Sequence, residues 1–161
     1  MKLVMCLAII VICAAIGRQL ANKMSARLAF FREYQTAVTF LFDKVVGLGS
    51  DLYQALYACS NENIRPFFHA CAEALKKNPQ LRLDTIWRES LAGISAQLAC
   101  LNKQDIRFLL DGGEALEALC ANPSERQAVL YTKRLAAQLD ALEAEKKKSA
   151  GFSTRLGCLA A

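Results

Sequence analysis

The most restrictive feature of this sequence is a stretch of 29 residues, 18–46, that contains neither glycine nor proline. Apolar side chains recur in it every three or four positions, a spacing that places them on one face of an α-helix. The sequence therefore predicts one long amphipathic helix of about 43 Å. Its apolar face would be buried in the chain's own bundle or, alternatively, against a second copy as a coiled coil. The apolar positions are Leu20, Met24, Leu28, Phe31, Tyr34, Val38, Leu41 and Val45.

Composition and periodicity favour an all-α fold for the remainder. Hydrophobic residues make up 54% of the 161 residues and aromatic residues only 8%, with eight glycines and three prolines, which suits helices rich in alanine and leucine. We expect an antiparallel helical bundle of about six helices, because short loops separate the segments. After a turn at 47–51, the further helices are expected at about 52–59, 64–77, 84–98, 103–119 and from 123 onward.

Capping signals mark three of these helix starts. Asn63 precedes one helix and is a candidate N-cap. Asn102 and Asp105 have the spacing of a capping arrangement, in which each side chain bonds the backbone of the other. Asn122 and Glu125 flank a proline and predict the start of the last long helix.

The first residues form an uncharged apolar run, 3–16. Fourteen residues rise about 21 Å as a helix, which makes a marginal membrane span unless Lys2 and Arg18 snorkel. We expect a transmembrane anchor at 1–17, continuous with the first helix of a cytoplasmic bundle at 18–150. The alternative is a signal peptide whose cleavage releases a secreted or lipid-anchored helical binding protein. The expected anchor residues are Leu3, Val4, Ile9, Ile10, Val11, Ile12 and Ile16.

The net charge of +5 is unevenly distributed along the chain. Residues 1–42 carry five basic residues and one acidic residue, a net charge of +4, whereas residues 43–161 carry +1. Basic residues next to an apolar run favour contact with a membrane surface, and by the positive-inside rule they place the bundle in the cytoplasm. Nucleic-acid binding is not expected, because such proteins spread basic residues over one face with aromatic residues between them.

The sequence offers few groups for catalysis. The seven cysteines contain no CxxC pair, which favours small core residues in a reducing compartment. His69 is the only histidine, and Cys71 lies about 200° around the same helix, so the two cannot share a metal within that helix. No glycine-rich phosphate loop is present. We expect no enzyme activity, no cofactor and no small-molecule substrate. The single tryptophan, Trp87, is expected in the core or, less often, as an interface anchor.

The order of motifs resembles the stage III sporulation protein AB family of endospore-forming bacteria. That family has a Trp-containing helix followed by Asp-x-x-x-Leu-x-x-x-Gly, and here Trp87 precedes Asp105, Leu109 and Gly113. The resemblance spans nearly the whole chain. It implies a fold similar to the cytoplasmic domains of the inner-membrane platform protein of type II secretion and type IV pilus systems.

Two further family features follow toward the C-terminus. The family has a Leu-Gly turn leading to Asp and, four residues later, Gln; Leu119 and Gln127 match it, whereas Cys120 and Pro123 stand where Gly and Asp are usual. It closes with a second transmembrane helix that begins with a Leu-Gly pair. Leu156 and Gly157 resemble its first turn, so residues 151–161 are expected to start a second membrane segment that this sequence does not complete.

The resemblance also implies a role and partners. The protein would be a non-enzymatic adaptor in the channel-like complex between mother cell and forespore, located in the mother-cell membrane facing the forespore. It would couple a cytoplasmic ATPase, stage III sporulation protein AA, to other stage III sporulation membrane proteins. Contact with that ATPase is expected at two turns far from the membrane, formed by Leu48, Ser50 and Asp51 and by Cys120, Asn122 and Ser124.

Overall fold

The computed structural model describes residues 2–47, 51–59, 63–94, 97–121 and 125–159, with side chains from residue 11 to residue 148 except 47, 97, 125 and 127. This described part is all-helical and contains six α-helices and no strand, as the sequence predicts. The α-helices are α1 (Lys2–Phe42), α2 (Leu52–Tyr57), α3 (Arg65–Lys77), α4 (Leu83–Gly93), α5 (Lys103–Ala121) and α6 (Glu125–Leu159). A π-helical turn, η1 (Asp43–Gly47), extends α1, and a 3-10 turn, η2 (Gln97–Cys100), precedes α5.

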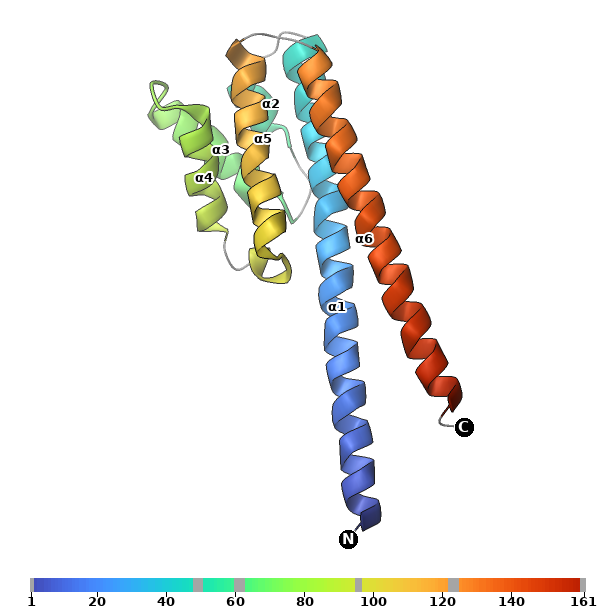
Figure 1. Ribbon diagram of the computed structural model, residues 1–161. Helices are drawn as coiled ribbons and strands as arrows, with labels where there is room; N and C mark the ends of the chain where they lie inside the picture. The colour runs from blue at the N-terminus through green and yellow to red at the C-terminus, as the bar shows by residue number, and fades with distance from the viewer. Residues whose placement is uncertain (1, 48–50, 60–62, 95–96, 122–124, 160–161) are drawn as a thin grey trace.

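Two long helices organise the molecule (Figure 1). α1 and α6 run antiparallel, and the shorter helices α2 to α5 lie against only one half of their length. The other halves project beyond the rest of the fold and diverge, so both chain ends lie at the same end of the molecule. We call residues 2–27 of α1 and 143–159 of α6 the basal end, and residues 28–142 the body.

Burial follows this division. Side chains 11–22 of α1 are all exposed, and the first core residue on that helix is Leu28. The predicted apolar face is therefore buried in the chain's own bundle from Leu28 to Leu41, whereas Leu20 is 64% exposed, contrary to the expectation. On α6 the core positions run from Tyr131 to Leu142.

Aromatic side chains from several helices fill the centre of the body. Phe31 and Tyr34 on α1 are fully buried, as are Phe67 and Phe68 on α3 and Trp87 on α4. Burying a side chain of this size stabilises the fold by about 1.5–3 kcal/mol or more. The short helices are therefore held by their contact with α1 and with one another, because helices of 6 to 13 residues are marginal on their own.

The helix starts agree with the sequence in part. Asn102 and Asp105 form the expected reciprocal cap: each backbone N–H donates to the other side chain, at 3.0 and 2.8 Å. Asp51 caps α2 by accepting from the backbone N–H of Tyr53. Asn63 does not cap α3, because its side chain and backbone N–H both donate to Glu33 on α1, and Ile64 takes the cap position.

Two predicted boundaries differ from the structure. The helix expected to reach residue 98 ends at Gly93, and Leu98 lies in the 3-10 turn instead. α5 continues through Cys120 to Ala121, so Cys120 belongs to its last turn and not to the loop. α6 runs without a break past residue 150, through the Ser/Gly stretch, to Leu159.

Candidate functional site

The described residues contain no catalytic constellation, so the candidate site consists of the motif residues and the surfaces that they position. Trp87 is a core residue with 1% exposure. Its indole Nε1–H donates to the backbone carbonyl of Leu109 at 2.8 Å, and its ring packs edge-on against Phe67 with centroids 4.7 Å apart. This indole therefore fixes how α3, α4 and α5 pack together.

Gly113 is the point at which that ring meets α5. A Cβ atom at Gly113 would lie 2.7 Å from Cγ and 2.8 Å from Cδ1 of Trp87, closer than real side chains approach. The neighbouring Gly112 has the same role on the other side of the helix, where a Cβ would collide with the hydroxyls of Tyr34 and Tyr131. Two adjacent glycines thus let α5 lie close to α4 on one side and to α1 and α6 on the other.

Those two tyrosines share a buried hydrogen bond. The hydroxyls of Tyr34 and Tyr131 lie 3.0 Å apart, and the Tyr131 hydroxyl also donates to the carbonyl of Phe108 at 3.4 Å. Burial raises the pKa of both hydroxyls above the ordinary value of 10.0, with the charges of neighbouring groups adding to the shift for Tyr34. The pair joins α1 to α6 across α5.

Asp105 connects the body to the basal end. Its carboxylate is fully buried and accepts from Nε of Arg27 at 2.6 Å and from Nη2 of Arg27 at 2.8 Å, a bidentate pair. It also accepts from the side chain of Gln138 on α6 and from the Asn102 cap described above. One carboxylate therefore ties together α1, α5 and α6, where the two long helices leave the body.

A second set of ion pairs follows the α1–α6 seam. Nη1 of Arg27 lies 3.3 Å from Glu145, and Arg32 pairs with Glu143 at 2.5 Å. The hydrogen bond from Arg32 lowers the pKa of Glu143. Both contacts are at least partly exposed, so they fix the register of the two helices more than they stabilise the fold.

The anchor residues lie outside the body. Among those with described side chains, Val11 is 59%, Ile12 57% and Ile16 52% exposed. The other four, Leu3, Val4, Ile9 and Ile10, belong to α1, and their side chains lie outside the described part. Over the described residues no helix has the length and hydropathy of a membrane span, so the expected transmembrane helix is not confirmed.

Two of the six predicted partner-contact residues lie within the described part of the chain. Asp51 and Cys120 are exposed. Leu48, Ser50, Asn122 and Ser124 lie outside the described residues, as does the side chain of Gln127, which is in the first turn of α6. Leu156 and Gly157 lie in the last turns of α6, also without described side chains. Leu119 is fully buried on α5 and contributes to the core.

The thiols of the body have the environment of structural cysteines. Burial raises the pKa of Cys59 and of Cys71 to about 12, and it also raises the pKa values of Cys100 and Cys120. His69 stacks on Tyr57 with ring centroids 4.4 Å apart. Among the described residues, no group of His, Cys, Asp or Glu side chains could hold a metal ion.

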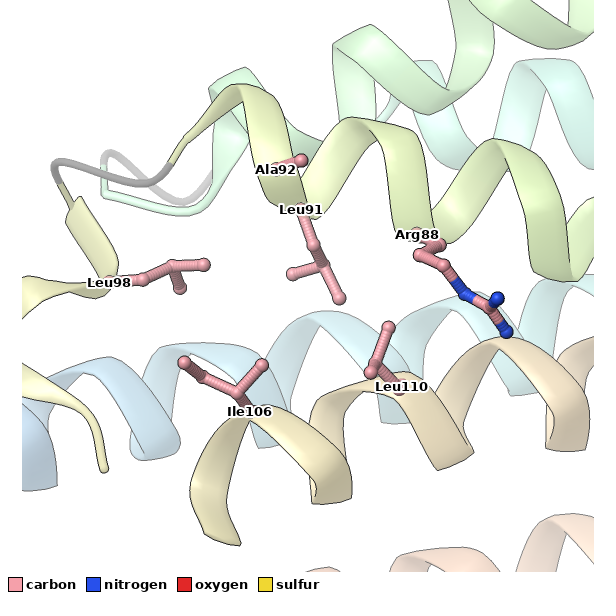
Figure 2. Close-up of a pocket in the computed structure, with 6 residues that line it drawn as sticks. All are labelled: Arg88, Leu91, Ala92, Leu98, Ile106 and Leu110. Carbon is pink, nitrogen blue, oxygen red and sulfur yellow. The ribbon is translucent and has the colours of Figure 1, made fainter. Parts of the chain in front are cut away.

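A pocket of about 350 Å³ lies between α4, η2 and α5. Figure 2 shows Leu91, Leu98, Ile106 and Leu110 pointing into it, with the Arg88 guanidinium at its edge. Arg88 is the one polar residue among those that line it, and the other five are apolar.

A comparison with family models matches residues 2–161 to stage III sporulation protein AB. The chain belongs to this family. Membership supports a role in sporulation. Neither the curated proteins nor the solved structures gave a match to the chain.

The structure shows which contacts the residues of the family motif make, and the sequence did not predict these contacts. Trp87, Leu109 and Gly113 form one contact between α4 and α5, and Asp105 forms the junction with α1 and α6. Arg27 and Gly112 were not among the predicted site residues. In the structure both Gly112 and Gly113 are buried, whereas Asp111 and Glu114 on the same helix are exposed. The adjacent glycines in "DGGEALE" were the available signal for close helix packing.

Proposed function

We propose that this protein is a membrane-anchored, non-enzymatic scaffold of the stage III sporulation complex between mother cell and forespore. In this role it couples the cytoplasmic ATPase, stage III sporulation protein AA, to other membrane proteins of the complex. The bundle lies in the cytoplasm on the mother-cell side. The observation that carries the proposal is the match of residues 2–161 to the stage III sporulation protein AB family.

Membrane attachment through residues 1–17 is supported by the exposure of apolar side chains at the basal end. Val11, Ile12, Ile16 and Leu20 are each more than half exposed on a helix that projects from the body (Figure 1). Exposed apolar surface of this kind is typical of membrane or protein contact sites. The run at 3–16 is short for a span, but Lys2 and Arg18 have side chains long enough to reach the interface.

Partner contact is proposed at the end opposite the chain termini. The turn η1, the last turn of α5 and the first turn of α6 lie there, far from the basal end (Figure 1). Two adjacent apolar side chains in the first turns of α6, Val129 and Leu130, are 47% and 53% exposed. A membrane at the basal end would leave this end accessible to a cytoplasmic protein.

A pull-down with purified stage III sporulation protein AA tests the coupling role. The double substitution Val129→Lys with Leu130→Lys changes exposed positions, so helicity and melting temperature stay nearly constant while retention of the ATPase falls at least about tenfold. Leu48→Asp with Asn122→Lys tests the two turns in the same way. Leu81→Lys is the matched control, because Leu81 is 43% exposed and lies between α3 and α4.

The outcomes separate two levels of the proposal. If the loop and α6 variants retain the ATPase as well as the unmodified protein does, the contact site is elsewhere. If the unmodified protein retains no ATPase, the coupling role is wrong.

A further inference from the structure

Charge is strongly segregated between the two regions of the molecule. The basal end carries eight basic and two acidic residues, a net charge of +6, whereas the remaining residues carry twelve basic and thirteen acidic residues, a net charge of −1. No acidic residue precedes Glu33 and none follows Glu145. The net positive charge of the protein therefore comes entirely from the basal end.

The tertiary structure brings together basic segments that are far apart in the sequence. Arg18 and Lys23 lie on α1, and Lys146, Lys147 and Lys148 lie on α6. Figure 1 shows the two segments at the same end of the molecule, where α1 and α6 leave the body. All five of these side chains are exposed.

The contact between Arg27 on α1 and Glu145 on α6 shows which positions of the two helices lie side by side, and the basic residues can be placed relative to it. Lys148 lies three residues past Glu145, about 4.5 Å along α6, and Lys23 lies four residues before Arg27, about 6 Å along α1 in the same direction. Arg18 is about 7.5 Å further along α1. The basic residues thus form a collar between the body and the apolar run at 3–16, at the depth of lipid headgroups if that run enters the bilayer.

The nearby acidic side chains do not cancel this collar. Glu145 and Glu143 are the two acidic residues of the basal end, and each is within ion-pair distance of an arginine on α1. The collar also lacks the aromatic side chains that stack on bases, since none lies between residues 11 and 29 or between 143 and 148. Its chemistry therefore fits phosphate groups at a lipid surface better than nucleic acid.

We propose that the collar formed by Arg18, Lys23 and Lys146–Lys148 binds anionic phospholipid headgroups. This inference rests on the proposed membrane attachment and adds to it a lipid preference in which α6 takes part together with α1. The apolar run provides attachment to any bilayer, and the collar adds affinity for negatively charged ones. A lysine or arginine near an anionic surface strengthens binding roughly fivefold.

Vesicle flotation of the full-length protein tests the collar. Partition onto phosphatidylcholine vesicles is compared with partition onto phosphatidylcholine vesicles that also contain phosphatidylglycerol, at low and at high salt. The unmodified protein is expected to prefer the anionic vesicles, and the preference should shrink at high salt. The triple variant K146Q/K147Q/K148Q should lose at least about tenfold of the partition onto anionic vesicles and keep its partition onto phosphatidylcholine.

Two further variants make the test specific. K77Q/K103Q/K133Q removes the same charge from exposed positions of the body and should leave the lipid preference intact. K146R/K147R/K148R keeps the charge and should behave as the unmodified protein. Circular dichroism confirms that each variant is folded.

Each contrary outcome has a distinct meaning. Equal partition of the unmodified protein onto both vesicle types overturns the collar and leaves membrane attachment standing. Failure to float with either type overturns the membrane attachment itself. The collar proposal is also wrong if the body variant loses the lipid preference as strongly as the collar variant does. It is wrong as well if duplex DNA displaces the protein from anionic vesicles as effectively as salt does at equal charge.

Discussion

The two ends of α1 have similar apolar content, but the apolar side chains of one end are buried and those of the other are exposed. In the body, residues such as Phe31, Val38 and Leu41 are at most 1% exposed, whereas at the basal end Ile12, Ile16 and Leu20 are more than half exposed. The helix itself does not distinguish them, because α1 is continuous from Lys2 to Phe42. The difference is what lies beside the helix: α2 to α5 cover the body and meet the basal end where it joins the body, at the pair of Arg27 with Asp105 (Figure 1). Stability therefore resides in the body, and the apolar side chains of the basal end are left uncovered.

The largest expected effect comes from breaking the junction between the two regions. Asp105→Ala removes the partner of Arg27, the cap of α5 and the contact with Gln138 together. We expect a loss of about 3–5 kcal/mol in the free energy of unfolding, measured by urea denaturation, because a partly buried arginine loses its carboxylate.

Two comparisons sharpen this result. Asp105→Asn keeps a capping oxygen and should lose less than alanine does. Arg32→Gln breaks the exposed pair with Glu143 and should cost much less than Asp105→Ala. Equal losses of unfolding free energy from Asp105→Ala and Arg32→Gln would show that the buried ion pair stabilises the protein no more than the exposed one does.

A matched pair of glycine substitutions compares the regions directly. Gly113→Ala places a methyl group against the buried Trp87 ring and should destabilise the body by about 1–3 kcal/mol. Gly17→Ala at the basal end has nothing within 4 Å of the new methyl group, so it should leave the melting temperature unchanged or raise it slightly. Thermal denaturation followed by circular dichroism measures both. If Gly113→Ala and Gly17→Ala have the same melting temperature, the contact of Trp87 with α5 does not require a glycine at position 113.

The cysteines provide a smaller, pH-dependent comparison. The pKa values of Cys59 and Cys71 are raised by burial from 9.0 to about 12, so the folded state holds these protons while the unfolded state releases them above pH 9. Their stabilising contribution is complete below pH 9 and is lost as the pH rises from 9 toward 12. The free energy of unfolding should fall by up to about 1.4 kcal/mol per pH unit for each thiol over that range.

Substitution tests the two thiols in turn. Cys71→Ala should reduce the fall of stability above pH 9 by the contribution of one thiol, and Cys59→Ala with Cys71→Ala should reduce it by the contribution of two. An alkaline slope that is the same in all three proteins would assign the pH dependence to other groups, such as the Tyr34–Tyr131 pair.

Local chemistry in the sequence was sufficient to predict much of this protein. The absence of glycine and proline over residues 18–46 determined a continuous helix, and Asn102 with Asp105 determined the start of another, because helix propensity and capping act over neighbouring residues. Periodicity also identified Leu28, Phe31, Tyr34, Val38 and Leu41 as one buried face of α1. The order of the motif residues was enough to place the chain in its family.

Only the tertiary structure decided which residues act together. The pairing of Arg27 with Asp105, across 78 positions, depends on how α1 and α5 pack and leaves no signal in the local pattern. The same holds for the helix ends: Asn63 had the residue type of a cap but found a better partner in Glu33. The basic collar is a further case, since the sequence places Lys23 and Lys148 at opposite ends of the chain and the antiparallel packing of α1 and α6 brings them to one end of the molecule. Contacts between distant segments depend on how the shapes of two whole helix faces fit together. The pattern of a single sequence shows which residues form each face but not which other face packs against it.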